Sequence, residues 1–232
     1  MTRTATAAVL ALTRFRLAAY ARSHRIIQPF IGLLAIMIVL YSTGVPSGQE
    51  LPTYSDSAAM LVPVFAWAVR GLLDTEPDVQ RLISVTATGR PGREVTSGLL
   101  AGASVAAGLA LLALLVPLAI GFADFPSGEV LAGGAALHLL SLTTGTALGT
   151  LTSRPILPDP AMSTLALLGG YVTILLISLA PLTWLTVPVI GWIRAAGKPS
   201  FLTAALPALA LITLAWCTAA LVTYIRLRRT HP

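Results

Sequence analysis

The side chains of this chain that could do chemistry are few and lie far apart in the sequence. His24, His138 and His231 have no acidic companion at the spacing of a metal site. The single cysteine, Cys217, excludes an internal disulfide and a cysteine metal cluster. Gly191–Ser200 looks like a phosphate-binding loop, but five residues instead of the usual four separate its glycines, and a proline follows the lysine. We therefore predict no catalytic, cofactor or metal site, and no enzymatic activity of this chain by itself.

Acidic residues are also poorly placed for chemistry inside a membrane. All nine aspartates and glutamates fall in expected loops or at the ends of apolar stretches. A proton-coupled carrier or an intramembrane protease usually needs a carboxylate buried within its spans. This placement argues against both classes.

The one substantial polar interruption between long apolar stretches is the segment Asp74–Thr96. It contains acidic residues, a short amphipathic stretch and a Gly-Arg-Pro-Gly-Arg turn. We expect a short helix over 82–88, whose apolar residues are Leu82, Ile83 and Val85. A short helix that lies against a membrane face could be contacted and displaced by a soluble partner.

Composition places these residues in an integral membrane protein. Hydrophobic residues make up 56% of the 232, charged residues only 10%, and mean hydropathy is +0.83. A soluble domain has about 25% charged residues. Runs of about 20 apolar residues match the hydrocarbon core, and only helices or closed barrels satisfy the backbone there. The runs do not alternate as barrel strands would, so we predict an all-α domain, 1–232, with six transmembrane helices at about 26–45, 57–73, 97–122, 130–151, 162–185 and 202–224.

Basic residues indicate the orientation of this six-helix bundle. Only Arg194 and Lys198 fall on one side, and Arg70 lies at the border. Twelve arginines share the other side: Arg3, Arg14, Arg16, Arg22, Arg25, Arg81, Arg90, Arg93, Arg154, Arg226, Arg228 and Arg229. The positive-inside rule predicts that both termini and the 74–96 loop are cytoplasmic. The net charge of +6 then indicates attraction to membrane lipids and not to nucleic acid.

Two segments outside the spans have amphipathic character. In 4–25, Val9, Leu12 and Phe15 recur at helical spacing, which predicts an interfacial helix; a disordered basic tail is the alternative. Pro181–Ser200 is too apolar for an ordinary external loop and contains two tryptophans. We expect short re-entrant helices there on the outer side; the alternative is a long fifth span followed by a plain loop.

Polar residues within the spans have two interpretations. His138, Thr143 and Thr144 could line a substrate path, or could be a packed neutral histidine and interhelical hydrogen-bonding groups. Arg70 could extend to the interface, or could pair with an acid of the following loop. Gly145 and Gly149, four residues apart, permit close helix approach.

The passage Leu82–Gly102 resembles the loop that follows the second span in ABC-2 type permeases. In that comparison Asp78 or Glu76 stands at the acidic position, Leu82–Thr88 is the coupling helix, and Arg90–Arg93 is the turn. The outline of an interfacial helix, six spans and a long segment before the sixth is also similar.

The resemblance implies a membrane-spanning permease subunit of a bacterial ABC exporter, located in the plasma membrane. It implies pairing with a second permease chain, either identical or a sister, and with a dimer of a cytoplasmic ATPase that binds ATP and Mg. The cargo would be apolar or amphipathic, such as a drug, lipid or peptide. The alternatives are a non-transporting immunity, assembly or sensor protein and, less favoured, a secondary carrier. The ATPase-coupling residues implied are Asp78, Leu82, Ile83, Val85, Arg90 and Arg93.

Overall fold

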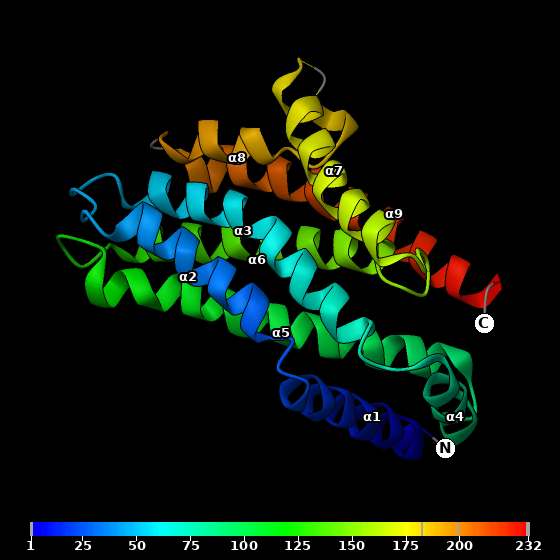
Figure 1. Cartoon of the computed structure of the whole chain (residues 1–232). Coiled ribbons are helices and arrows are strands. Elements are labelled where there is room, and N and C mark those ends of the chain that lie inside the picture. The colour runs from blue at the N-terminus through cyan, green and yellow to red at the C-terminus, as the bar shows by residue number, and fades with distance from the viewer. Residues whose placement is uncertain (1, 182, 199, 231–232) are drawn as a thin grey trace.

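The computed structural model describes the backbone of residues 2–181, 183–198 and 200–230, and their side chains apart from those of 2–5, 78, 87–88 and 229–230. Within these ranges every regular element is a helix (Figure 1). In chain order they are α1 (Thr2–Arg22), α2 (Ile27–Tyr41), α3 (Glu50–Leu73), α4 (Asp78–Thr88), α5 (Pro91–Ile120), α6 (Gly128–Leu151), α7 (Pro160–Leu179), η1 (Thr183–Leu185), α8 (Val189–Ala196), η2 (Phe201–Ala205) and α9 (Leu206–Thr230). η1 is a 3-10 turn, and η2 is a π-helical segment that continues into α9.

Five helices are long and apolar enough to cross a membrane: α3, α5, α6, α7 and the continuous helix formed by η2 and α9. α1 and α2 meet at a bend of 74° and pass the same test only as a pair. α2 alone has 15 residues. At the helical rise it is roughly 22 Å long, shorter than a hydrocarbon core of about 30 Å. Within the described residues the expected all-helical, membrane-type architecture is thus confirmed, with five candidate spans, or six if the bent α1–α2 pair is one span.

The start of α3 differs from the expectation. The helix begins at Glu50, well before Ser57, so Asp56 lies inside α3 and not in a loop. Its side chain is half-buried. The expectation that every acid lies in a loop or at a span end is therefore wrong for Asp56. Hydropathy marks only the apolar part of a helix, and the first turns of α3 are polar.

The connection between α4 and α5 is shorter than the expected turn. Gly89 ends α4 in the left-handed conformation (φ 69°), which glycine adopts without a Cβ penalty. Arg90 is extended, and Pro91 already occupies the first position of α5, where its missing N–H costs nothing. Arg93 therefore belongs to the first turn of α5 and not to a loop.

The most extensive helix contact joins α3 to α6. A Cβ atom at Gly149 would come within 2.4 Å of Ala66 O, and Gly145 approaches α3 almost as closely. Ser141 Oγ donates to Ala58 O across the same contact at 2.5 Å. Glycines four residues apart let two backbones meet and maximise dispersion contacts, as the spacing in the sequence predicts. We call this contact the α3–α6 seam.

Other helices surround this seam unequally. In the most apolar stretches of α7 and of the η2–α9 helix, only 17% and 11% of the residues are buried. In Figure 1, α7 leans away from the layer formed by α2, α3, α5 and α6, while α1 and α4 lie at one end of the bundle. Short helices occupy the segment between α7 and α9, where α8 buries Trp192 completely.

Candidate functional site

The short helix α4 presents an apolar face that the chain leaves open. Val79, Leu82 and Ile83 are 71%, 58% and 62% exposed. They lie three and four positions apart, so they share one side of the helix. Val85 is half-buried on another side. Of the residues expected to contact a partner, Leu82 and Ile83 are therefore brought together on a free surface, and Val85 is not.

The charged residues in and around α4 differ in how far their side chains are exposed. Arg90 is exposed just before α5, and Arg93 is half-buried in the first turn of α5. Asp78 begins α4, but its side chain lies outside the described residues. Glu76, the other residue that could stand at the acidic position, is buried in the α3–α4 connection.

Glu76 belongs to a buried charge network of two arginines and two glutamates. Arg16 of α1 forms ion pairs with Glu76 and with Glu94 of α5. Arg228 of α9 pairs with Glu94, with Nη2 2.9 Å from Oε2. Each of the four residues is less than 9% exposed. The formal charges balance, which is the condition under which buried ions are tolerated.

Further hydrogen bonds join α4 and α5 to this network. Ser84 Oγ, on the inner side of α4, donates to Glu76 Oε1 at 2.5 Å. Arg16 Nη1 donates to Glu94 O at 2.9 Å and to Ser97 Oγ at 3.1 Å. The network thus ties α4 and the loop before it to α1, α5 and α9. The sequence does not reveal it, because its members lie up to 212 positions apart, from Arg16 to Arg228, and carry no shared motif.

A second charged contact closes the same end of the bundle. Arg70 Nε lies 3.4 Å from Asp74 Oδ2, and Arg70 Nη1 donates to Thr164 Oγ1 of α7 at 2.9 Å. The N–H of Arg154 donates to Asp74 Oδ1 at 2.6 Å. Burial raises the pKa of Asp74, and the Arg154 N–H and nearby guanidinium groups act against that rise. Of the two interpretations of Arg70, pairing with Asp74 is the one observed.

The three candidate path residues do not share a surface. His138 is fully buried, with Nδ1 2.9 Å from Gly134 O and Nε2 3.3 Å from Ser57 Oγ. Thr144 is buried and donates to a carbonyl of its own helix at 2.8 Å. Thr143 is half-buried and lines a different surface, an apolar groove between α5, α6 and α9. These contacts are those of packed polar groups.

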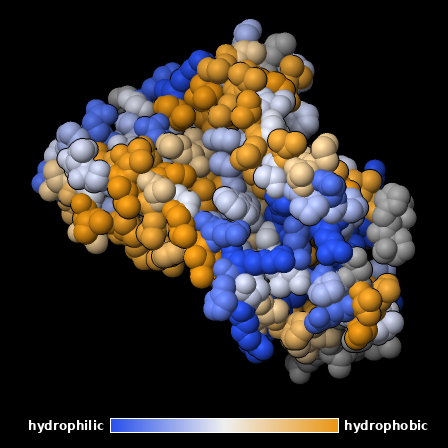
Figure 2. Space-filling view, viewed as in Figure 1, coloured by the Kyte–Doolittle hydropathy of each residue, from blue (hydrophilic) through white to orange (hydrophobic). Residues whose placement is uncertain are grey.

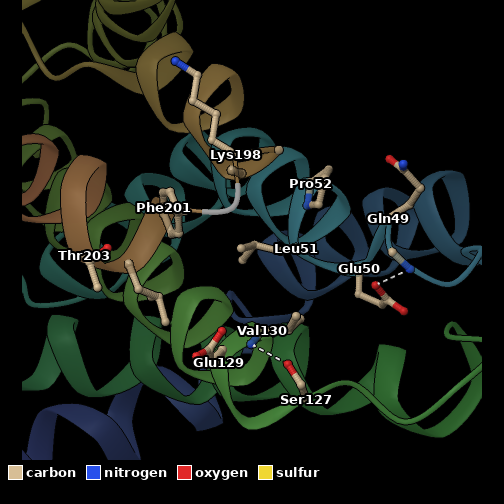
Figure 3. Close-up of a pocket in the computed structure, with 14 residues that line it drawn as sticks. Gln49, Glu50, Leu51, Pro52, Ser127, Glu129, Val130, Lys198, Phe201 and Thr203 are labelled. Carbon is tan, nitrogen blue, oxygen red and sulfur yellow. Dashed lines mark hydrogen bonds between the residues drawn. The ribbon is translucent and has the colours of Figure 1, made fainter.

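The opposite end of the bundle holds a cavity of about 450 Å³ between the starts of α3 and α6 and the α8–η2 segment (Figure 3). Leu51 and Phe201 line it. Glu50 also lines it but accepts a hydrogen bond from Gly48 N at 2.8 Å, within its own turn. Figure 3 shows the Lys198 side chain directed away from the cavity. Glu129 is then the remaining charged residue of the lining, and we assign the cavity no ligand.

Neither end offers a metal site, since the described residues contain no group of three or more potential metal-ligating side chains. Comparisons with protein-family models, with curated proteins and with solved structures found no match to this chain. The likeness to ABC-2 permeases therefore stays a prediction from the 82–102 passage. The open face of α4 and the charge network beneath it are the features on which a function can be argued.

Proposed function

We propose that this chain is the membrane-spanning permease subunit of an ATP-driven exporter of the ABC-2 type, and that α4 is its coupling helix. The single observation that carries the proposal is the exposed apolar face of α4, formed by Val79, Leu82 and Ile83. This face lies on a helix too short to span a membrane and directly above a buried charge network.

An apolar face of this kind is best explained by a partner that covers it. Burying apolar surface stabilises a complex by roughly 25 cal/mol per Å². Clustered exposed apolar residues on a soluble face mark an interaction site, whereas scattered ones need no explanation. A cytoplasmic ATPase dimer with bound ATP and Mg is the proposed partner, because this chain contains no nucleotide-binding motif and needs an energy source for export.

The charge network supports a transmission role for α4. Glu76 precedes α4, and Glu94 follows it. Both are held by Arg16, and Glu94 is also held by Arg228 at the end of α9. A displacement of α4 by the ATPase would therefore move α1, α5 and α9 together. Such a movement would open a path for an amphipathic cargo at the contact with a second permease chain.

The remaining parts of the proposal concern placement in the membrane. The arginine distribution supports cytoplasmic termini, with the charge network on the inner side. The resemblance to ABC-2 permeases implies a bacterial plasma membrane location. α1 would lie in the interface and α2 would be a short sixth span in a locally thinned bilayer. η1 and α8 would form the external re-entrant segment, with α8 packed on α3.

The test replaces apolar by charged residues on the open face of α4. Leu82→Asp and Ile83→Asp should insert normally but fail to co-purify an ATP-hydrolysing subunit from native membranes, because a charge cannot be buried there without a partner. Leu82→Met is the matched control, since it keeps the surface apolar. Mg-ATP hydrolysis by the detergent-purified complex is the measurement. A wild-type protein that retains no ATPase would instead support a non-transporting membrane protein.

A further inference from the structure

A second cavity, separate from α4, lies between α2, α3 and α7. It has a volume of about 660 Å³, within the usual range for small-molecule sites. Val64 and Trp67 of α3 and Leu167 and Leu168 of α7 form one part of its lining. Trp67 and Leu168 remain 44% and 52% exposed. We call this cavity the α2–α7 cleft.

Polar and apolar lining residues of the cleft are separated along the helices. The polar ones come from the start of α2, the end of α3 and the start of α7, and include Arg25, Gln28 and Arg70. The apolar ones lie about one helical turn or more further into the bundle on α3 and α7. Figure 2 shows hydrophilic atoms gathered where α2 begins and α3 ends, with apolar surface on either side. The cleft is therefore amphipathic, with its polar end where the candidate span α3 ends and the candidate span α7 begins.

The polar end carries an excess of positive charge. Arg25 is exposed there and donates to the Asp74 carbonyl at 3.1 Å. The carboxylate of Asp74 is already used by Arg70 and by the Arg154 N–H. With Arg25 and Arg70 against Asp74 alone, one positive charge remains formally unbalanced among the lining residues.

The beginning of α2 adds to this positive character. The helix has no acidic residue in its first turn, and no side chain caps its first N–H groups. The Ile27 N–H donates to His24 O at 3.1 Å and Pro29 has no N–H, so what this terminus contributes toward an anion is the positive end of the helix dipole. This end and the two arginines come from separate segments, and all three meet at the polar end of the cleft.

We infer that the α2–α7 cleft binds an anionic phospholipid, with the phosphate at Arg25 and Arg70 and an acyl chain along Trp67 and Leu168. Charge selects the headgroup, since guanidinium groups match phosphate oxygens in geometry as well as in charge. The apolar lining favours a molecule that also has an acyl chain over a free anion, because the chain buries apolar surface there. The inference does not depend on transport, because the cleft shares no residue with the open face of α4.

The first experiment tests the headgroup. Native mass spectrometry of the protein in neutral detergent would compare phosphatidylglycerol with phosphatidylcholine of identical acyl chains. We expect the anionic lipid to be retained more tightly, and Arg25→Gln to weaken its binding about tenfold, the effect of losing one charged hydrogen bond. The matched control is Arg14→Gln, which removes an exposed arginine of α1 outside the cleft. Equal retention of both lipids, or an Arg25→Gln protein that binds as the wild type does, would overturn the inference.

The second experiment tests the apolar part of the cleft. Leu168→Trp should fill it and reduce phosphatidylglycerol binding, whereas Leu165→Trp places the same side chain on an exposed position of α7 outside the lining. Glycerol phosphate, which has no acyl chain, should fail to displace the lipid at equal concentration. Displacement by glycerol phosphate would show a simple anion site and would contradict the lipid assignment.

A second copy of this chain is the competing occupant of the cleft. In a Cys217→Ser background, Leu168→Cys would then form a disulfide-linked dimer readily, while Leu165→Cys would not. We expect no such selective cross-link when phosphatidylglycerol is bound. Selective cross-linking that persists in the presence of phosphatidylglycerol would assign the cleft to a dimer interface and remove the lipid site.

Discussion

The α3–α6 seam and the charge network are both buried, but different forces hold them. The seam joins two helices through glycines at helical spacing, with Gly149 against Ala66 O. The network joins four segments through Arg16, Glu76, Glu94 and Arg228. Close packing has one arrangement and resists displacement, whereas ion pairs gain little net free energy after desolvation. The seam is thus suited to stability, and the network to holding four separate segments in a defined mutual position.

The seam should give the largest response to substitution. Gly149→Leu places a side chain where the Cβ alone would lie 2.4 Å from a backbone oxygen, which cannot rotate away. We expect complete loss of folded protein or destabilisation above about 5 kcal/mol, beyond the usual range of overpacking, because the clash is with backbone. Gly108→Leu is the control, because a Cβ there meets nothing within 4 Å. Thermal unfolding in detergent measures both, and equal unfolding temperatures would contradict the close packing of the seam.

Substitutions in the charge network should give the second largest loss of stability, and only when they leave its charges unbalanced. Glu94→Gln leaves Arg16 and Arg228 buried without their shared partner, which we expect to cost about 3–5 kcal/mol of unfolding free energy. The double variant Glu94→Gln with Arg228→Gln should be less destabilised than the sum of the single variants. A double-mutant cycle measures this coupling. Strict additivity would show that the pair does not interact.

The open face of α4 should respond least in stability and most in activity. Leu82→Asp and Ile83→Asp change exposed side chains, so we expect the unfolding free energy to move by no more than about 0.5 kcal/mol. The unfolding free energy and the retention of the ATPase are both measured on each variant. A variant that loses the ATPase but keeps its stability distinguishes α4 from the seam and the network, where substitution lowers stability. A large loss of stability would show that α4 is part of the core and not a docking surface.

Labelling decides which end of the bundle faces the cytoplasm, with no expected change in stability. In a Cys217→Ser background, Ser47→Cys should react with an impermeant thiol reagent in intact cells, and Ser23→Cys should react only after permeabilisation. Both positions are exposed. The reverse pattern would put the charge network outside and remove the proposed ATPase contact.

Local helical structure was the feature that could best be predicted from the sequence. The apolar spans follow from the length of their apolar runs, and the short helix after the second span and the close approach at the seam follow from residue spacing. The structure confirms the helices and the close approach. Errors arose where polar residues begin a helix, as at Glu50 of α3. They also arose where a turn residue belongs to a helix, as at Pro91 of α5. Hydropathy and turn propensity are averages, and a helix end depends on individual hydrogen bonds.

By itself, the sequence determined the all-helical class, the membrane-type composition and the presence of a polar loop between α3 and α5. Tertiary structure alone decided which charges meet. Arg16 and Arg228, which the sequence shows only as basic residues of the two terminal segments, are buried against Glu76 and Glu94. Periodicity reports only which side of its own helix a residue occupies. Partners from other helices depend on how the bundle packs, and that packing brings α1, α5 and α9 together beneath α4.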